Sequence, residues 1–472
     1  MSDPQGEAPL YEALCRAAGG QAAWLHVPAH RQAAPEGASC LQGAYRLDLT
    51  ELPGTDDLHC PRGAIKAAQS LAARAWGADR TFFLVNGTSG GLHAALLAAL
   101  RPGQKLVLPR NIHRSVMAPV IWSGADPVWV DPVFVPEFAL TGWIETGTWR
   151  SALQEAPAAV LLVHPTYDGL AGDLKSLTAA AHTAGVPVLV DEAHGAHLRF
   201  HPALPPDAMA CGADLAVQST HKTGGALTQA SMLHVREGRL DTGRLAGALN
   251  LVQTTSPSFP LLASLDLARR DLLREGRARL DRALRLSAML RTRLARCPGL
   301  AVLEPGDLPA GGSLDPTRVT VSVRRTGLSG FDVARELEER HRVRVEAAGA
   351  ATILAVLGTG TRAEDVLALA AALEEIGREG RRTWPVPRPP RPPKRLTPRE
   401  AWFAGRRRVP LADAAGHVSG ELIAVHPPGL VAVCPGEEMT PEVVAYLTEV
   451  RALGLAVHGA ADGTLATVRV LE

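Results

Sequence analysis

Short apolar runs alternate with amphipathic segments between residues 81 and 235, and this pattern predicts strands connected by helices. Continuous apolar runs are typical of parallel strands that are buried on both faces. The alternation of strands and helices implies right-handed βαβ crossovers. We therefore expect an α/β fold with a mostly parallel sheet and helices on both faces. The expected strands are 81–86, 105–108, 127–130, 158–163, 186–190 and 214–217, and the expected helices include 63–76, 92–100 and 176–184.

The remainder of the chain predicts a smaller α+β domain and a terminal module. Residues 261–296 form a long helical segment rich in Leu, Ala and Arg, which is expected to lead from the sheet to the smaller domain. The proline-rich segment 382–394 predicts a stiff polyproline II spacer. The expected divisions are an N-terminal segment at 1–55, a large domain at 56–295, the α+β domain at 296–380, a linker at 381–395 and a C-terminal module at 396–472.

Composition narrows the classes of function. The 472 residues are 46% apolar, enough for a large core, and 49 Lys plus Arg balance 48 Asp plus Glu. Because there is no basic field, nucleic acid and anionic membrane are not expected partners. The six cysteines form no CxxC pattern, so neither a disulfide framework nor a cysteine metal site is expected. The N-terminus has no signal-peptide pattern and no apolar run has spanning length, so the expected compartment is the cytoplasm.

Polar side chains follow two of the expected strands at the point where each strand ends. Asp191 ends the run 186–190, and Ser219, His221 and Lys222 follow the run 214–217. In open α/β sheets, ligands bind at the carboxyl ends of the strands. A carboxylate, a hydroxyl, an imidazole and an amine in one crevice suit pyridoxal phosphate (PLP). A lysine forms a Schiff base with its aldehyde, an acid partners its ring nitrogen and hydroxyls hold its phosphate.

A second segment predicts a site for an anion. The strand at 81–86 is followed by Gly87-Thr88-Ser89-Gly-Gly91 and then by a helix. Free N–H groups and the helix dipole favour a phosphate at such a helix start. The segment lacks the GKS or GKT ending of a nucleotide P-loop, and taken alone it is as consistent with an ordinary strand–helix turn. His113 also follows the end of a strand, so it could reach the same crevice.

The histidines after Asp191 also admit a metal site. His194 and His197 are three residues apart and could share a helical face. No HExxH pattern and no cysteine pair supports zinc, so PLP is favoured and no metal is expected.

Several motifs together resemble one known family. The segment that begins Ser219-Thr-His-Lys-Thr and runs to Met232 looks like the PLP-attachment signature of the ornithine/lysine/arginine decarboxylases. The resemblance is to the short bacterial form, and it implies the aspartate-aminotransferase fold, also called fold type I. Similar motifs occur along nearly the whole chain: His26-Val-Pro-Ala-His30, Asn86-Gly-Thr-Ser89, Arg110-Asn-Ile-His-Arg-Ser115, Pro165-Thr-Tyr-Asp-Gly169, Asp191-Glu-Ala-His194, Leu396-Thr-Pro-Arg-Glu-Ala-Trp402, Pro427-Pro-Gly429 and Pro435-Gly-Glu437.

The resemblance implies roles for individual residues. Lys222 would form the Schiff base, Asp191 would pair with the ring nitrogen and His113 would stack on the ring. The phosphate would be held by Thr88, Ser89, Ser219 and His221, Ala193 would pack under the ring, and His194 is expected among the cofactor contacts.

The resemblance also implies an activity and an assembly. The activity is PLP-dependent decarboxylation of a basic amino acid to agmatine or a diamine, in polyamine metabolism, with arginine favoured over lysine or ornithine. A homodimer or larger homo-oligomer is expected, with sites near the subunit interface. Carboxylates would select the basic tail, and the candidates are Asp168, Asp315 and Glu346.

The chain departs from the family pattern at Ala29, Arg31, His164, Gly224, Gly225 and Gly349. These positions put the substrate in question more than the cofactor. Two alternatives therefore stay open. One is a PLP aminotransferase or lyase of the same fold, and the other is a PLP-binding protein that has lost catalysis.

Overall fold

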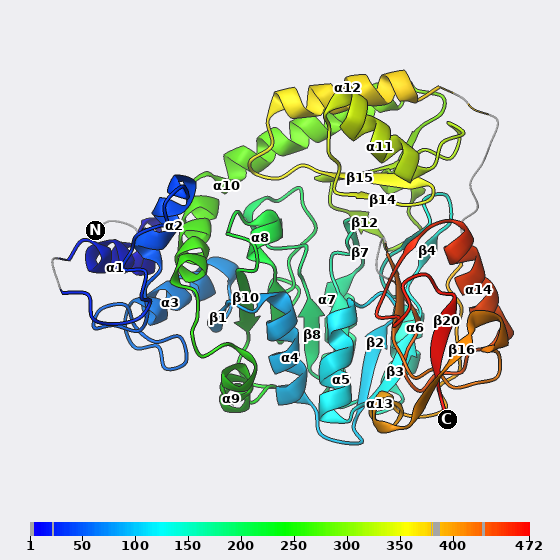
Figure 1. Cartoon of the computed structure of the whole chain (residues 1–472), viewed down its shortest axis with the longest axis horizontal. Helices are drawn as coiled ribbons and strands as arrows, with labels where there is room; N and C mark the ends of the chain where they lie inside the picture. The colour runs from blue at the N-terminus through cyan, green and yellow to red at the C-terminus, as the bar shows by residue number, and fades with distance from the viewer. Residues whose placement is uncertain (1–3, 21–22, 379, 381–387, 427–429) are drawn as a thin grey trace. The chain divides into compact units, whose positions relative to one another are not determined.

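The structure is a computed structural model that describes residues 4–20, 23–378, 380, 388–426 and 430–472. It divides into two compact units, each assembled from separate stretches of the chain (Figure 1). The first unit comprises Met1–Ala99 and Pro187–Leu280, and the second comprises Leu100–Val186 and Asp281–Glu472. The domain limits expected from the sequence stay a prediction, because these units combine segments that are distant in the chain.

Four strands form the sheet of the first unit in the order β1-β10-β9-β8. β8 (Val188–Asp191) and β9 (Leu215–Gln218) are parallel, and Asp191 lies opposite Val217. β10 (Ser231–Val235) and β1 (Arg80–Leu84) continue the sheet with antiparallel pairing. A parallel return needs a crossover of a dozen or more residues, usually through a helix. The connection from β9 to β10 contains only the short helix α8 (Thr220–Thr223) in place of a crossover helix, and β10 pairs antiparallel with β9.

The glycine-rich segment after β1 forms the first turn of a helix. α4 (Gly87–Ala99) begins five residues before the expected start at residue 92, and Gly87 has a φ of +70°. A Cβ on Gly91 would lie 2.5 Å from Cγ1 of Val217 and 2.6 Å from Cδ1 of Leu84. Only glycine therefore lets this helix lie directly on the strands. α4 packs beside α9 (Thr242–Val252), as Figure 1 shows.

The N-terminal helix is attached to the first unit by a buried ion pair. α1 (Pro9–Ala18) and α3 (Ala64–Trp76) share an apolar core with the start of α10 (Phe259–Leu294). On α10, Asp266 and Arg269 are fully buried and paired at 3.0 Å. The Asp266 carboxylate accepts the Leu10 N–H at 2.9 Å, which satisfies one of the free N–H groups at the start of α1. The short helix α2 (Gln42–Leu47) lies between α1 and α3 in the sequence.

The second unit begins with three parallel strands in the order β6-β2-β3. These are β2 (Lys105–Pro109), β3 (Asp126–Val130) and β6 (Ala159–Val163), and each lies within one residue of an expected strand. The accompanying helices are α5 (Met117–Ser123), α6 (Thr146–Leu153) and α7 (Leu174–Thr183). Four short strands form two antiparallel pairs: β4 (Phe134–Val135) with β5 (Leu140–Thr141), and β7 (Leu170–Ala171) with β12 (Ser313–Leu314).

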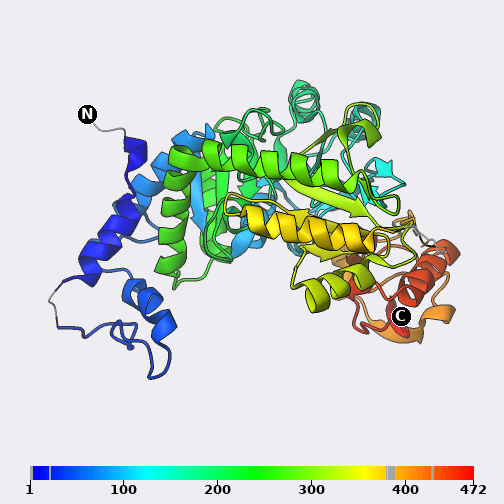
Figure 2. The same cartoon turned by 90° about the horizontal axis from the view of Figure 1, so that it is seen from above.

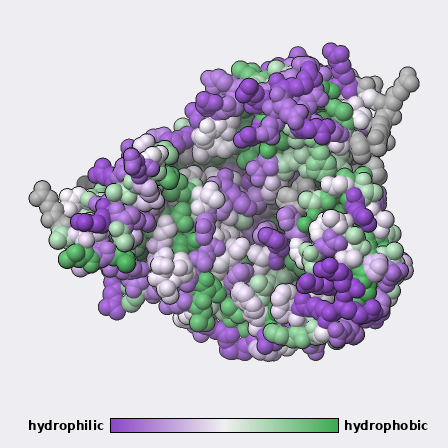
Figure 3. Space-filling model, viewed as in Figure 1, coloured by the Kyte–Doolittle hydropathy of each residue, from purple (hydrophilic) through white to green (hydrophobic). Residues whose placement is uncertain are grey.

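An antiparallel sheet follows in the order β11-β13-β15-β14. Its strands are β11 (Ala301–Val302), β13 (Arg318–Ser322), β14 (Ala347–Ala348) and β15 (Thr352–Val356). α11 (Gly330–His341) and α12 (Ala363–Ile376) share an apolar core with the sheet and with the end of α10. Figure 2 shows α12 alongside this end of α10, where Arg293 and Glu374 pair at 2.5 Å. Hydrophilic side chains cover the outer face of α11 and α12 in Figure 3, as expected for amphipathic helices.

In its described residues, the C-terminal module contains two small sheets and two α-helices. β16 (Arg406–Pro410) pairs with β20 (Thr467–Leu471), and a three-stranded sheet has the order β18-β17-β19. The latter strands are β17 (Ile423–His426), β18 (Leu430–Val433) and β19 (Ala456–His458), and the helices are α13 (Pro398–Phe403) and α14 (Pro441–Ala452). The expected linker and the Pro427–Gly429 motif lie partly or wholly outside the described residues. No helix in the described part of the chain has the length and apolar character to cross a membrane.

Candidate active site

Parallel pairing of β8 and β9 brings the polar residues at their ends to one edge of the sheet. Asp191, at the end of β8, is 4% exposed, and its Oδ1 accepts the Ala193 N–H at 3.1 Å. Burial raises the pKa of Asp191, and the positive charge of Lys222 opposes that rise. A further cation beside this carboxylate would favour its ionised form.

Lys222 lies on α8, directly after β9. Its Nζ is 2.9 Å from Nε2 of His194, which follows β8. The prediction that His194 and His197 could share a helical face is wrong, because residues 192–197 form turns and only Leu198–Phe200 is helical. The turns direct His194 to the lysine, so an amine and an imidazole are within hydrogen-bonding distance.

Two hydroxyls meet where the start of α4 approaches the end of β9. The Oγ1 of Thr88 lies 2.7 Å from the Oγ of Ser219, and both side chains are buried. Ser89 is the next residue in the same first turn of α4, which is thirteen residues long. Hydroxyls beside the N–H groups of a helix start make a suitable site for a phosphate.

One ring nitrogen of His221 bonds within the protein, and its contact with a phosphate stays a prediction. Its Nδ1 bonds the Ala230 carbonyl oxygen at 3.0 Å, so this nitrogen is the donor. Burial lowers the pKa of His221, with the charge of Lys222 adding to the effect. In the neutral ring Nε2 is an acceptor, so His221 could donate to a phosphate only when the ring is protonated.

The expected ring-stacking residue, His113, belongs to the second unit. It is exposed, and its Nδ1 lies 2.7 Å from the Oγ of Ser115 in the short turn after β2. Its contact with a cofactor ring stays a prediction.

A buried polar chain behind the site was not predicted from the sequence. Glu192 follows Asp191, and its carboxylate accepts the Gln218 amide and the Ala208 N–H, both at 2.7 Å. The Gln218 Oε1 lies 3.1 Å from Nε2 of His234, and Nδ1 of His234 lies 2.8 Å from Oγ1 of Thr81. Burial lowers the pKa of His234 to about 3, so its ring is neutral. The only sequence signal was a histidine within an apolar strand.

Two departures from the family pattern have a local explanation. A Cβ on Gly224 would lie 2.8 Å from Cγ2 of Thr220 and 2.9 Å from its carbonyl oxygen. Gly225 has a φ of +89°, which larger side chains rarely adopt. The chain after Lys222 therefore turns more tightly than a bulky residue would allow.

Three carboxylates were suggested to bind the basic side chain of the substrate, and they differ in accessibility. All lie in the second unit. Asp315 is fully buried, accepts hydrogen bonds from the Thr317 N–H and hydroxyl, and lies 3.8 Å from Arg318. Glu346 is exposed, and its carboxylate accepts the Tyr167 hydroxyl at 2.9 Å. Of the two, Glu346 is the carboxylate that an incoming cation can reach.

Asp168 is the third of these carboxylates and is buried. Burial raises its pKa to about 7, although the Arg318 charge opposes the rise. Arg318 packs tightly here, because a Cβ on Gly169 would lie 2.6 Å from its Cγ.

The groups of the first unit fit pyridoxal phosphate in type and arrangement. The Thr88 and Ser219 hydroxyls and the start of α4 suit the phosphate, Asp191 suits the ring nitrogen, and Lys222 supplies the amine. Thr220 and Thr223, on either side of Lys222, also have buried hydroxyls that form no hydrogen bond with the described residues.

Comparison with known proteins shows the family of the chain. A sequence model described as the Orn/Lys/Arg decarboxylase major domain matches residues 8–308, and one for the C-terminal domain of the same family matches residues 391–461. The chain belongs to the Orn/Lys/Arg decarboxylase family. The resemblance stated from the motifs is therefore confirmed.

Two relatives of this decarboxylase-family chain match nearly its whole length, and a third matches about half of it. It is 40% identical to an arginine decarboxylase of Bacillus subtilis, covering 99% of this chain and 98% of the relative. An arginine decarboxylase of Halalkalibacterium halodurans is 37% identical with the same coverage. A constitutive lysine decarboxylase of Escherichia coli is 29% identical over 49% of this chain and 34% of its own length.

Solved structures confirm the fold class. Lysine decarboxylase A from Pseudomonas aeruginosa matches with a TM-score of 0.85 at 23% identity, covering 98% of this chain and 80% of that one. Alanine–glyoxylate aminotransferase from Nostoc sp. matches with a TM-score of 0.54 at 23% identity, covering 67% of this chain and 87% of that one. The expected α/β fold of the aspartate-aminotransferase type is therefore correct.

The raised pKa of Asp168 predicts a pH-dependent stability. Because the folded-state pKa is about 7 and the ordinary value is 3.8, the folded state binds more protons between these values. The stabilisation is complete below the ordinary value and is lost as pH rises through the folded pKa. Asp168→Asn removes this dependence, so the variant should gain stability relative to the parent as pH rises from about 5 to 8.

Thermal unfolding midpoints of both proteins across that pH range measure the effect. Asp173→Asn is the matched control, since Asp173 is an exposed helix cap whose pKa is lowered mainly by its bond to Ser176. Its offset from the parent should be constant over the range. A constant offset for Asp168→Asn as well would contradict the prediction.

Proposed function

We propose that this protein decarboxylates arginine to agmatine and CO2 with pyridoxal phosphate, with lysine and ornithine as poorer substrates, and acts in polyamine metabolism. The observation that carries the proposal is the meeting of Asp191, Lys222, Thr88 and Ser219 at one sheet edge. Full-length relatives named arginine decarboxylase support the choice of substrate.

Each group of the site would have a distinct task. Pyridoxal phosphate, when bound, supplies an electron sink that lets a bond to the substrate Cα break. The Asp191 carboxylate would hold a proton at the ring nitrogen, and burial strengthens that charge pairing. The Thr88 and Ser219 hydroxyls would orient the phosphate, which fixes the position of the reacting carbon.

Lys222 and His194 would transfer protons near the reacting carbon of the substrate. The Lys222 amine would hold the cofactor covalently until the substrate amine takes its place. Nε2 of His194 lies 2.9 Å from the Lys222 Nζ, so a proton can pass between them. When the bond from Cα to the carboxylate breaks, its electron pair stays with Cα, and a proton must then be returned to that carbon.

The substrate proposal predicts the products of a three-amino-acid panel. Purified protein with added pyridoxal phosphate should release CO2 from arginine faster than from lysine or ornithine, with one agmatine formed per CO2. Radiometric CO2 capture and chromatography of the amine measure both. A keto acid without CO2 would instead indicate an aminotransferase, and no product from any substrate would indicate a PLP-binding protein that has lost catalysis.

The assignment of Lys222 predicts the site of covalent labelling. The chain contains five lysines, namely Lys66, Lys105, Lys175, Lys222 and Lys394. Borohydride treatment of the PLP-loaded protein should remove its visible absorption band and place the label on the peptide that contains Lys222. Peptide mass spectrometry identifies that peptide, and a label on one of the other four lysines would refute the assignment.

The role of Asp191 predicts a defect in turnover rather than in cofactor binding. Asp191→Asn keeps the shape but removes the charge that holds the ring proton, so kcat should fall by roughly 100-fold or more while most cofactor is retained. Steady-state kinetics and bound-cofactor absorbance measure the two effects. Asp241→Asn, the same change at the exposed cap of α9, should leave both unaltered. Unchanged turnover in a fully loaded Asp191→Asn protein would exclude the proposed role.

We also propose that the active protein is a cytoplasmic homodimer or larger homo-oligomer. Two-fold dimers are the commonest symmetric assemblies, and the family resemblance implies sites near a subunit interface. Sedimentation at assay concentration should give at least twice the mass of one chain. A fully active monomer would overturn this part of the proposal.

A further inference from the structure

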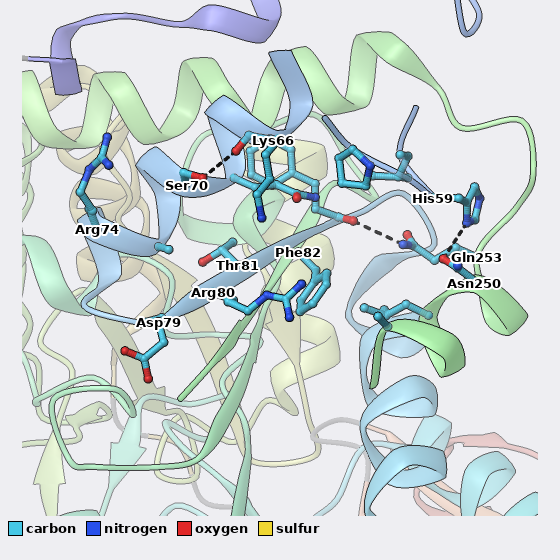
Figure 4. A pocket seen from close by; sticks show the side chains of 18 residues that line it. His59, Lys66, Ser70, Arg74, Asp79, Arg80, Thr81, Phe82, Asn250 and Gln253 are labelled. Atoms are coloured by element: carbon cyan, nitrogen blue, oxygen red, sulfur yellow. Dashed lines mark hydrogen bonds between the residues drawn. The ribbon is translucent and has the colours of Figure 1, made fainter. Parts of the chain in front are cut away.

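The first unit contains a cavity separate from the residues proposed for decarboxylation. Its volume is about 360 Å³, and its walls come from α3, β1, α9 and the loop around His59 (Figure 4). None of Thr88, Asp191, Ser219 and Lys222 lines it. A cavity of this size can enclose a small organic molecule.

The charged lining of this cavity is mainly positive. Lys66, Arg74 and Arg80 contribute cations, and Asp79 contributes the single carboxylate. In Figure 4 the Lys66 amine and the Arg80 guanidinium extend toward the same space, whereas Arg74 and Asp79 lie at its edge. Arg80 lies over the Phe82 ring at 5.1 Å. Among the described residues, neither Lys66 nor Arg80 forms an ion pair, and both line the cavity, so an anion bound there would meet two cations without a carboxylate partner.

The remaining lining suits the uncharged part of a ligand. Leu58, Phe83 and Leu249 provide apolar wall, and Thr81 and Gln253 provide polar groups. Lysine and arginine are the side chains that proteins use most for phosphate, as a point charge and as a bidentate fork.

We infer that this cavity is a regulatory site for a small organic phosphate, whose phosphate group lies between Lys66 and Arg80. The apolar wall receives the organic part of the ligand. The site is distinct from the one proposed for arginine and pyridoxal phosphate.

One wall residue connects the cavity to the proposed phosphate-binding turn. The Gln253 Oε1 accepts the Val85 N–H at 3.0 Å, and its amide donates to the Phe83 carbonyl oxygen at 3.4 Å. Val85 lies two residues before Gly87, where α4 begins. A ligand that reorients Gln253 would therefore disturb the backbone that leads into Thr88.

A second wall residue connects the cavity to the end of β8. The Thr81 hydroxyl is the first member of the buried chain that continues through His234 and Gln218 to Glu192. Glu192 is the neighbour of Asp191 in the sequence. Both connections run through hydrogen bonds within one unit, so occupation of the cavity can bias the positions of both proposed cofactor contacts.

Calorimetry on the full-length, PLP-supplied protein tests the site. The probes are adenosine monophosphate and glycerol 3-phosphate, with adenosine, glycerol, inorganic phosphate and citrate as comparison ligands. At least one organic phosphate should bind, and more tightly than its unphosphorylated counterpart or citrate. Lys66→Met and Arg80→Met should each weaken that binding by roughly tenfold or more. Lys175→Met and Arg101→Met remove the same charges from exposed positions outside the cavity and should leave it unchanged.

Three results would overturn the inference: no organic phosphate binds, no organic phosphate binds more tightly than its unphosphorylated counterpart, or the cavity and control variants bind alike. If Arg80→Met does not fold, Lys66→Met decides the question, since Lys66 is exposed on α3. If a cavity variant differs from the parent in sedimentation but binds the phosphate as the parent does, the cavity belongs to a subunit contact. That result would also overturn the inference.

The connection to the active site has its own test. Gln253→Leu should weaken phosphate binding less than Lys66→Met or Arg80→Met does, and it should reduce the effect of the bound phosphate on the cofactor absorption spectrum and on KM. Because binding is measured by heat, failure of the phosphate site is distinguishable from failure of the proposed decarboxylation.

Discussion

Parallel pairing of β8 with β9 is the constraint on which the site depends. Asp191 lies opposite Val217, so the two strands end at nearly the same level, and the residues that follow them meet. A shift of one residue in this register would turn every side chain of a strand to the other face. Asp191 would then leave the edge where Lys222 and Ser219 lie. The proposed chemistry therefore requires this register.

A line of polar groups crosses the sheet of the first unit and favours one register. Glu192 follows β8, Gln218 ends β9, His234 lies in β10, and Thr81 lies directly opposite His234 in β1. Each member bonds the next, and Glu192 is buried enough that burial raises its pKa well above the usual value, with Asp207 nearby adding to the rise. Buried polar groups are costly when unpaired. A strand pairing shifted in register would leave several of these polar groups without a hydrogen bond. The line of polar groups therefore disfavours other registers.

The sequence predicted the elements better than their pairing. Apolar runs identified β2, β3, β6, β8 and β9 because buried parallel strands have a continuous pattern. β1 was expected as a strand and runs in the same direction as β9. β10, which pairs antiparallel with both, was not predicted, because strand direction depends on the connection rather than on apolar content. Asp191 and Lys222 were chosen as candidates because each follows such a run, and their roles stay predictions. The Glu192 line and Gln253 were not found, because contacts between distant single polar residues leave no periodic signal.

In the second unit, a contact of the C-terminal module was likewise not predicted from the sequence. Arg110 after β2 and Glu437 in the module were both noted as parts of motifs, but 327 positions separate them. In the structure they form two hydrogen bonds at 2.6 and 3.0 Å, and Arg110 also lies over Trp129 at 4.7 Å.

Glu437 is almost fully buried and also accepts the Cys434 N–H at 2.9 Å. Burial raises its pKa and Arg110 opposes that rise, so each charge is tolerated only because the other is present. This contact therefore stabilises the attachment of the module. Any arrangement in which the two motifs are apart would leave a buried charge without its partner. That accounts physically for why two motifs so far apart in the sequence belong together in one fold.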